Sequence, residues 1–412
     1  MADPQTASPT GEEADAPGSQ RVTPLELFFD LVVVFAITQV TGLLSDDPTW
    51  GGLLRGMLLL SALWWAWVTY AWLTNTLDPE EGAIRLVMFA SIGAMLIVSL
   101  AAPIAFGTGG VVFGVSYFVV RSPPLALYAI GGRGDRDRLG AVMRLVPSAT
   151  LGPGLIVAAA FLDGPAQMAV WGVALAIDYL GVLVGRMRGF SVSPEHFVER
   201  YGLVIIIALG ESIVAIGVGA AGLPLDSGLI TAALLGITVS AAIWWSYFDW
   251  ATYVSLARLN EATGASRAAL ARDLYSYLHL PMVAGIVLFA LGMKTTLAHV
   301  DEPLPTIPAL GLFGGIALYL IAHVALRLRI GGGWGHERTA AAVALIAMLP
   351  VAGRLRALTS LGLVTLICVA LVAYEAIRYR EGRAWIRSRR GAFTMEEAAR
   401  FAAPGRGARR RS

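Results

Sequence analysis

Long apolar stretches recur along nearly the whole chain, and short polar segments separate them. Most of these stretches approach the length of about 20 residues that an α-helix needs to cross a bilayer. We therefore predict an all-α polytopic membrane protein with about twelve transmembrane helices. The predicted spans cover residues 24–44, 52–73, 83–102, 109–130, 143–161, 166–185, 200–221, 228–250, 273–293, 307–328, 337–353 and 358–378.

Arginine is distributed unevenly among the connections between these spans. The connections after the fourth, sixth, eighth and tenth spans are rich in arginine, whereas those after the third, fifth and seventh contain neither arginine nor lysine. Cytoplasmic loops of membrane proteins are enriched in basic residues. The alternation therefore predicts that both termini lie in the cytoplasm.

Composition agrees with a membrane environment and sets the tails apart. The 412-residue chain is 56% hydrophobic and 15% charged, whereas a soluble domain has about 25% charged residues. The polar, Pro- and Gly-containing residues 1–20 predict a disordered N-terminal tail. Residues 381–412 are predicted to be a basic cytoplasmic C-terminal tail, with anionic-lipid or nucleic-acid binding as the less favoured alternative. We expect the lipid bilayer, and no nucleic acid, as a partner.

The two halves of the chain resemble each other in order. The segment Leu63-Trp64-Trp65-Ala66-Trp67 matches Ile243-Trp244-Trp245-Ser246-Tyr247 at an offset of 180 residues, and Phe113-Gly114 matches Phe313-Gly314 at an offset of 200. These collinear matches predict two parallel six-helix repeats, at residues 21–190 and 191–380. Parallel repeats occur in secondary transporters, whose binding sites lie where the halves meet.

Three carboxylates in the first and seventh spans are candidate proton or cation sites. Glu26 and Asp30 begin the first span, and extending the repeat puts Asp30 within one residue of Glu211. We therefore expect Asp30 and Glu211 to form a pseudo-symmetric pair at the interface of the halves. The alternative is that each acid binds a neighbouring helix or a buried arginine. Glu26 also fits an anion near a positive helix N-terminus.

Arg121 in the fourth span is the expected counter-charge for such an acid, and an anion-substrate ligand is the alternative interpretation. It is followed by Ser122 and the pair Pro123-Pro124, which we expect to interrupt the helix and free backbone carbonyls.

Further polar residues within spans are possible relay or ligand contacts. They are Gln39, Asp178, Asp249, Tyr275 and His279. The cluster Glu195, His196, Glu199 and Arg200 precedes or begins the seventh span, and we interpret it as a charged helix cap, with metal binding left open.

Signatures of enzymes are missing from the sequence. It contains no G-x-x-x-x-G-K-[ST] phosphate loop, no H-E-x-x-H, no C-x-x-C and no G-x-S-x-G. With one cysteine and five histidines, we expect no catalytic site, no cofactor and no bound metal.

Two motifs resemble the bacterial low temperature requirement A family. They are the run T-P-L-E-L-F-F-D-L-V-V-V-F-A-I-T-Q from Thr23 and the run E-H-F-V-E-R-Y-G-L-V-I-I-I-A-L-G-E-S from Glu195. The resemblance covers about Val22 to Arg380. It implies a multi-pass protein of the bacterial inner membrane that is associated with growth in the cold, and it implies no particular substrate.

The leading hypothesis from the sequence is a proton- or cation-coupled secondary transporter of a small molecule or ion. The rivals are a membrane-embedded enzyme or assembly factor for lipid or envelope precursors, and a sensor or structural protein that transports nothing. The sequence names neither the substrate nor the oligomeric state.

Overall fold

A computed structural model describes residues 21–131, 134, 136–185, 187–389 and 391–397. The predicted N-terminal tail and residues 398–412 of the predicted C-terminal tail lie outside the described residues. A helix is present at each of the twelve predicted spans. The first half contains α1 (Pro24–Asp46), α2 (Trp50–Thr74), α3 (Gly82–Ala101), α4 (Gly110–Gly131), α5 (Arg136–Ala159) and α6 (Gly164–Val184).

The second half contains more and shorter elements, because π-helical turns divide three of its spans. Its helices are α7 (Pro194–Ala220), α8 (Ser227–Ser246), α9 (Thr252–Glu261), α10 (Gly264–Ala271), α11 (His279–Ala298), α12 (Thr306–Ala309), α13 (Gly315–Arg329), α14 (His336–Ala352), α15 (Ala357–Arg378) and α16 (Arg380–Arg389). The π-helical turns are Tyr247–Ala251, Arg272–Tyr277 and Leu310–Gly314. Turns of this kind are rare in proteins, and those that occur often lie at functional sites.

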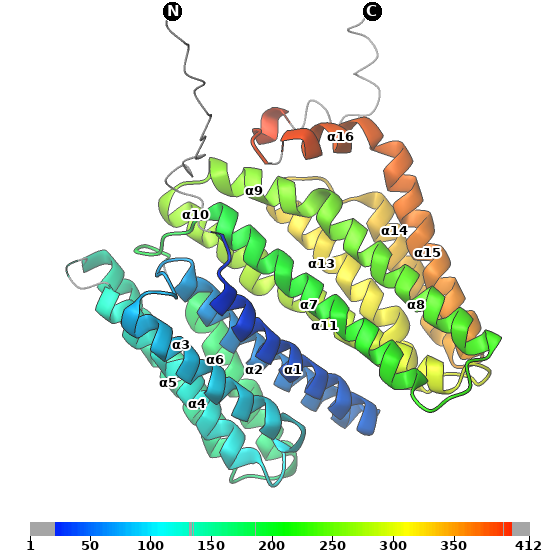
Figure 1. Cartoon of the computed structure of the whole chain (residues 1–412), viewed down its shortest axis with the longest axis horizontal. Helices are drawn as coiled ribbons and strands as arrows, with labels where there is room; N and C mark the ends of the chain where they lie inside the picture. Colours follow the sequence, from blue (N-terminus) through cyan, green and yellow to red (C-terminus); the bar gives the residue numbers. More distant parts are fainter. Residues whose placement is uncertain (1–20, 132–133, 135, 186, 390, 398–412) are drawn as a thin grey trace, which may run out of the picture.

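The polytopic helical class predicted from the sequence is confirmed. In the described residues, 11 helical segments are long and apolar enough to cross a membrane. The remaining predicted span is α14, which has 17 residues and contains Pro350. The α16 helix follows α15 directly and lies across the ends of the other helices (Figure 1).

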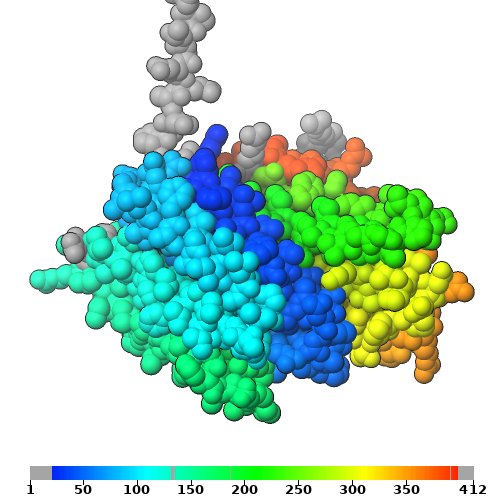
Figure 2. Space-filling view, turned by 60° about the horizontal axis from the view of Figure 1, so that its bottom comes forward, coloured from blue at the N-terminus to red at the C-terminus, as the bar shows by residue number. Residues whose placement is uncertain are grey.

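The two halves lie side by side, with α1 along their boundary (Figures 1 and 2). The start of α1 and the helix α16 lie at the same end of the bundle (Figure 1). A chain that crosses the bundle an even number of times ends on the side where it started. The most enclosed segments are α2, α10 to α11 and α12 to α13, whose apolar windows are 78%, 78% and 72% buried. These segments form the centre of the bundle.

Helix packing follows a similar pattern in the two halves. The first helix of each half packs against the second and third, the third against the fourth, and the second against the sixth. This holds for α1 to α6 and for the corresponding spans of α7 to α15. The pattern agrees with a duplication, and the six-plus-six repeat stays a prediction.

The expected interruption of α4 at its proline pair is wrong, because α4 is continuous from Gly110 to Gly131. Proline lacks an N–H, so Pro124 leaves the carbonyl of Val120 without its usual helical donor. The hydroxyl of Tyr70, on α2, donates a hydrogen bond to that carbonyl at 2.7 Å. A neighbouring helix thus satisfies the backbone group that the proline frees, as a membrane interior requires.

Candidate functional site

The start of α1 is fixed by a capping box. Thr23 is the N-cap and Pro24 is the first helical residue. The Glu26 amide donates to the Thr23 hydroxyl at 3.3 Å, and the Thr23 amide donates to the Glu26 carboxylate at 2.9 Å. This reciprocal pattern satisfies two backbone donors that a helix N-terminus otherwise leaves open. Glu26 is therefore an end-of-helix anion, and its carboxylate is fully buried against α7.

Arg200 of α7 is the cation that the acids of α1 face. Its guanidinium lies 2.7 Å from Asp30 and 3.4 Å from Glu26, and its side chain has no exposed area. The indole of Trp67, on α2, donates to the other oxygen of Asp30 at 2.8 Å and lies beneath the guanidinium. Three helices thus converge on one buried ion cluster.

Hydrogen bonds fix the tautomer of His196, the neighbour of this cluster. Asn75 accepts a hydrogen bond from the Ser193 amide through its carbonyl oxygen, so its NH₂ group points at Nδ1 of His196, 3.1 Å away. Nδ1 must then accept, and the ring proton lies on Nε2. Nε2 is 3.2 Å from Glu26 and donates to it. His196 is therefore a neutral donor to a carboxylate.

The interpretation of residues 195–200 as a charged cap is corrected by this geometry. His196 and Arg200 are buried inside the interface because α7 begins at Pro194, six residues before the predicted start of the span. Glu195 and Glu199 point elsewhere. Glu195 accepts from Asn260, and Glu199 accepts from the Val22 amide.

The expected pairing of Asp30 with Glu211 is also corrected. The contacts between α1 and α7 run at an offset of 170 residues, since Glu26 meets His196 and Asp30 meets Arg200. The same offset aligns Thr23-Pro24 with Ser193-Pro194, the two helix starts. The tryptophan match in the second and eighth spans has an offset of 180, which does not apply to these helices. The acids of α1 face bases instead of an acid.

Glu211 lies farther along α7 and meets a different part of α1. Its carboxylate is 2% exposed and receives a hydrogen bond of 2.6 Å from the Thr38 hydroxyl. Lys294 of α11 is close enough to act on it electrostatically. No arginine, lysine or histidine in the described residues lies within 4.0 Å of it to form an ion pair.

This difference separates the buried acids into two kinds. The buried acids in the described residues are Glu26, Asp30, Asp178, Glu211, Asp249 and Glu375. Arginine pairs with all of them except Glu211. An arginine partner favours the ionised form of an acid, and Glu211 is the buried acid of this group that has no such partner to displace before it takes up a proton.

Arg121 is a counter-charge, but its partner is a residue of its own half. Its guanidinium lies 2.8 Å from Asp178 of α6 and donates to the carbonyl of Trp65 on α2. Asp30 and Glu211 are bound by other residues. Arg121 and Asp178 therefore form an ion pair that is separate from the α1–α7 interface.

Asp249 belongs to a second buried network, at the end of the bundle where α16 lies. Arg383 of α16 binds both Asp249 and Glu375, and Arg338 of α14 binds Glu375 at 2.7 Å. Arg387 completes the network at its exposed edge. The network joins α16 to the bundle.

His279 and Tyr275 lie together in the core of the second half. The Nδ1 of His279 donates to the carbonyl of Leu274 at 2.8 Å, and its Nε2 accepts from the Tyr247 hydroxyl at 2.8 Å. The Tyr275 ring stacks on the His279 ring, 4.8 Å between centroids. Gln39 on α1 is half-buried. Within the described part of the chain, His279, Tyr275 and Gln39 form no hydrogen bond with Glu211 or Arg121.

Several residues of these sites could not be found from the sequence pattern. They are Asn75, Arg338, Glu375 and Arg383. The only available signal for Glu375 and Arg338 was a charge near the end of an apolar stretch, which most membrane helices have. Their partners come from distant helices, so the pairing depends on the fold.

Comparison with known proteins identifies the family. Residues 21–373 match the family of the bacterial low temperature requirement A protein (LtrA). An uncharacterized protein of Rhizobium meliloti (strain 1021) is 31% identical over 306 residues, which cover 72% of this chain and 74% of that protein. No solved structure matches. The match extends from the capping box of α1 almost to the end of α15, and the chain therefore belongs to the bacterial low temperature requirement A family.

Proposed function

We propose that this protein is a proton- or cation-coupled secondary transporter and that Glu211 is the group that binds and releases the coupling ion. The observation behind this proposal is that Glu211 is buried among the helices at the boundary of the halves without an arginine partner. A buried carboxylate in a membrane is costly, which makes it a candidate functional group. Glu26 and Asp30 have a structural role in this proposal, because Arg200 pairs with both and His196 donates a hydrogen bond to Glu26.

The contacts of Thr38 suit both protonation states of Glu211. The Thr38 hydroxyl is 2.6 Å from Glu211 and 3.2 Å from the carbonyl of Val34. A hydroxyl has a single proton and two lone pairs. With Glu211 ionised, Thr38 donates to the carboxylate. With Glu211 protonated, the carboxyl donates to Thr38, and Thr38 donates to Val34. Both states thus keep a hydrogen bond between Thr38 and Glu211.

The orientation in the membrane is part of the proposal. The arginine-rich connections follow the even-numbered spans, which end on the side where α1 starts and α16 lies. The positive-inside rule assigns that side to the cytoplasm of a bacterial inner membrane. Glu211 would then be reached from the cytoplasm past the Arg200 cluster, and from the other side past the end of α7.

The test is proton flux into sealed proteoliposomes that contain the purified protein and a pH-sensitive dye. Organic acids, salts and lipid precursors are added in turn under an imposed membrane potential. We expect flux that depends on one added class of compound and that is lost in Glu211→Gln. Ser212→Ala is the matched control, because Ser212 is buried beside Glu211 and its hydroxyl has no partner in the described residues.

Two outcomes contradict the proposal. One is the absence of flux in the wild type with every class of compound. The other is full flux in Glu211→Gln, which would show that the coupling group is elsewhere. The thermal stability of both variants is measured in parallel, so that loss of flux is attributed to a folded protein.

A further inference from the structure

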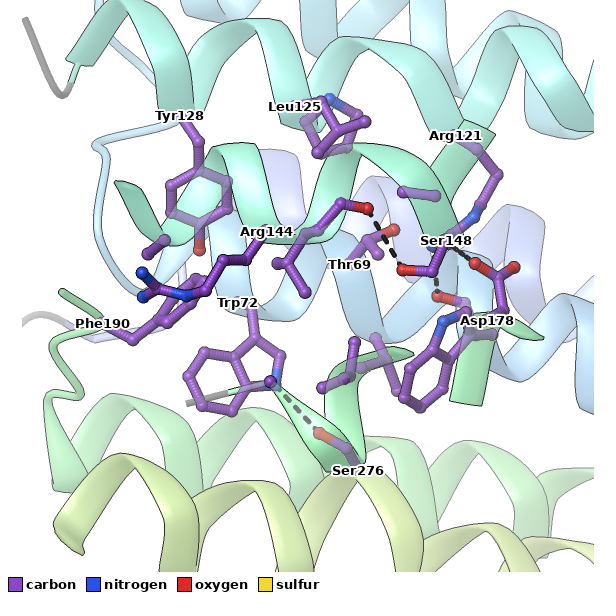
Figure 3. Close-up of a pocket in the computed structure, with 18 of the residues that line it drawn as sticks. Thr69, Trp72, Arg121, Leu125, Tyr128, Arg144, Ser148, Asp178, Phe190 and Ser276 are labelled. Atoms are coloured by element: carbon purple, nitrogen blue, oxygen red, sulfur yellow. Dashed lines mark hydrogen bonds and ion pairs between the residues drawn. The ribbon is translucent and has the colours of Figure 1, made fainter. Parts of the chain in front are cut away.

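The first half contains a pocket that is separate from Glu211. It lies between α2, α4, α5 and α6, and the connection from α6 to α7 closes one end. Most of its wall is apolar and aromatic, with the rings of Trp65, Trp72 and Phe190 among its lining. Figure 3 shows Arg121, Ser148 and Asp178 gathered at one end, and Tyr128 and Phe190 at the other.

The polar end of this pocket has hydrogen-bonding capacity that the described residues leave unused. Arg121 is 3% exposed and Asp178 1% exposed, and one oxygen of Asp178 binds Arg121 at 2.8 Å. The Nε of Arg121 and the second oxygen of Asp178 are buried without a hydrogen-bond partner in the described part of the chain. Buried polar atoms are normally satisfied, so two unpaired ones at the same end of one pocket indicate a missing ligand.

Gly152 of α5 lies directly against the acid. A Cβ atom there would lie 2.9 Å from the second oxygen of Asp178, closer than real Cβ contacts. Any larger residue at this position would displace Asp178 from its present place. The close approach of α5 to the carboxylate thus depends on Gly152.

Charge balance defines which ligand can enter. Arg121 and Asp178 together are neutral, and Arg144, the other charged residue of the lining, lies toward the opposite end beside Phe190 (Figure 3). An anion added at the Arg121 end would therefore place an uncompensated charge among apolar side chains, which is strongly unfavourable. Protonation of Asp178 removes this cost, because the guanidinium then pairs with the ligand. A carboxylate matches the planar guanidinium fork and has one charge for one proton. A dianionic phosphate would need a second compensating charge.

We propose that this pocket binds a small organic carboxylate with an apolar body, and that the carboxylate replaces Asp178 on Arg121 while Asp178 takes up one proton. The carboxylate and the proton enter together, no covalent bond changes, and the total charge of the site is the same before and after. This inference rests on the proposed transport function for its purpose, whereas the binding step can be measured without transport.

Other ionisable groups lie near the exchanging pair. They are Tyr117 on the same helix, Tyr70 on α2, Tyr179 on α6, Tyr277 of the π-helical turn before α11, and Tyr128 and Arg144 on the pocket wall. The tyrosines are neutral near pH 7 and arginine stays protonated. Asp178 is therefore the group whose charge changes in this range.

The experiment measures binding of benzoate to the full chain in lipid nanodiscs by calorimetry and by tryptophan fluorescence. Benzyl alcohol and benzylamine are the neutral and cationic controls. We expect saturable binding of benzoate alone, with uptake of one proton per molecule. The association constant should fall about tenfold per pH unit wherever Asp178 is ionised in the free protein.

Three variants test whether benzoate binds in this pocket and not elsewhere in the protein. In Asp178→Asn, benzoate binding should no longer be accompanied by proton uptake and should no longer depend on pH. Benzoate should raise the melting temperature of this variant more than that of the wild type, because it supplies the negative charge that Arg121 has lost. Ala149→Leu fills the pocket, leaves the ion pair intact and should abolish binding. Glu211→Gln should bind benzoate as the wild type does.

The outcomes distinguish this inference from the proposed function. Benzoate binding in Glu211→Gln without flux in any protein would support the carboxylate site and contradict transport. The inference is overturned if neither the wild type nor Asp178→Asn binds benzoate, phenylacetate or octanoate saturably. It is also overturned if benzyl alcohol binds equally well, or if no proton accompanies benzoate.

Discussion

Asp30 of α1 and Arg200 of α7 form an ion pair of 2.7 Å that is closed off from solvent and joins the first helices of the two halves. The two residues occupy corresponding places, each six positions after a proline that begins its helix. An acid in one half thus meets a base in the other. The opposite charges at these two places stabilise the boundary.

Breaking this pair should be costly. Asp30→Asn removes the closest partner of Arg200 while Glu26 still compensates its charge, and we expect a loss of about 1.5–3 kcal/mol of unfolding free energy. Glu211→Gln removes a buried charge that has no ion-pair partner, and Gln can still accept from Thr38, so its stability should equal or exceed that of the wild type. Thermal or denaturant unfolding in a mild detergent measures both. Equal losses in the two variants would contradict the distinction between paired and unpaired acids.

The tautomer of His196 predicts which substitution is tolerated. Gln at this position carries an NH₂ group that can replace the Nε2–H donor to Glu26, whereas Leu removes the hydrogen bonds that His196 makes with Glu26 and Asn75. We expect His196→Leu to cost about 1–3 kcal/mol more than His196→Gln. Unfolding of the two variants under one condition checks this. A protein in which Gln and Leu are equally destabilising would show that the Nε2 hydrogen bond contributes little.

The proposed proton flux should depend on the hydroxyl group of Thr38. Thr38→Ser keeps the hydrogen bonds to Glu211 and Val34, and its proton flux should stay within about twofold of the wild type if net hydrogen-bond differences are small. Thr38→Val has the same shape without the hydroxyl and should lose most of the flux at unchanged expression. The proteoliposome assay measures both variants, and full flux in the valine variant would remove Thr38 from the mechanism.

The attachment of α16 depends on Arg383 more than on Arg387. The Arg383 side chain is 6% exposed and binds two acids, whereas that of Arg387 is 47% exposed and binds one. We expect Arg383→Gln to release α16 and to cost several kcal/mol, as broken buried pairs do, and Arg387→Gln to cost about 1 kcal/mol or less. Hydrogen exchange of residues 380–389 reports the release. Unchanged protection in Arg383→Gln would contradict this role.

Close approach of α11 and α13 depends on two glycines. A Cβ at Gly285 would lie 2.5 Å from the Gly315 carbonyl oxygen, so Gly285→Ala must move the helices apart and should lower the melting temperature. Gly93 in α3 is the control, because nothing lies within 4 Å of its Cβ position. Gly93→Ala should be stabilising by about 0.5–1 kcal/mol, the helical difference between the residues. The prediction fails if both variants melt alike.

Local sequence signals predicted the elements well. The apolar runs located a helix at each of the twelve predicted spans, since the length of a membrane helix is set by bilayer thickness. Their ends were less predictable. The α7 helix starts at Pro194, before its apolar run, and this difference changed the interpretation of His196 and Arg200 from a surface cap to a buried cluster.

The sequence by itself determined that the chain is a bundle of membrane-spanning helices with acids in its first and seventh spans, because hydropathy and charge are properties of each segment alone. Only the tertiary structure decided which charge meets which. Arg121 pairs with Asp178, Asp30 with Arg200, and Glu211 with a hydroxyl. Each pairing joins different helices, and a one-turn change in the register between helices would exchange the partners. Which buried acid has an arginine partner and which has a hydroxyl is set by that register.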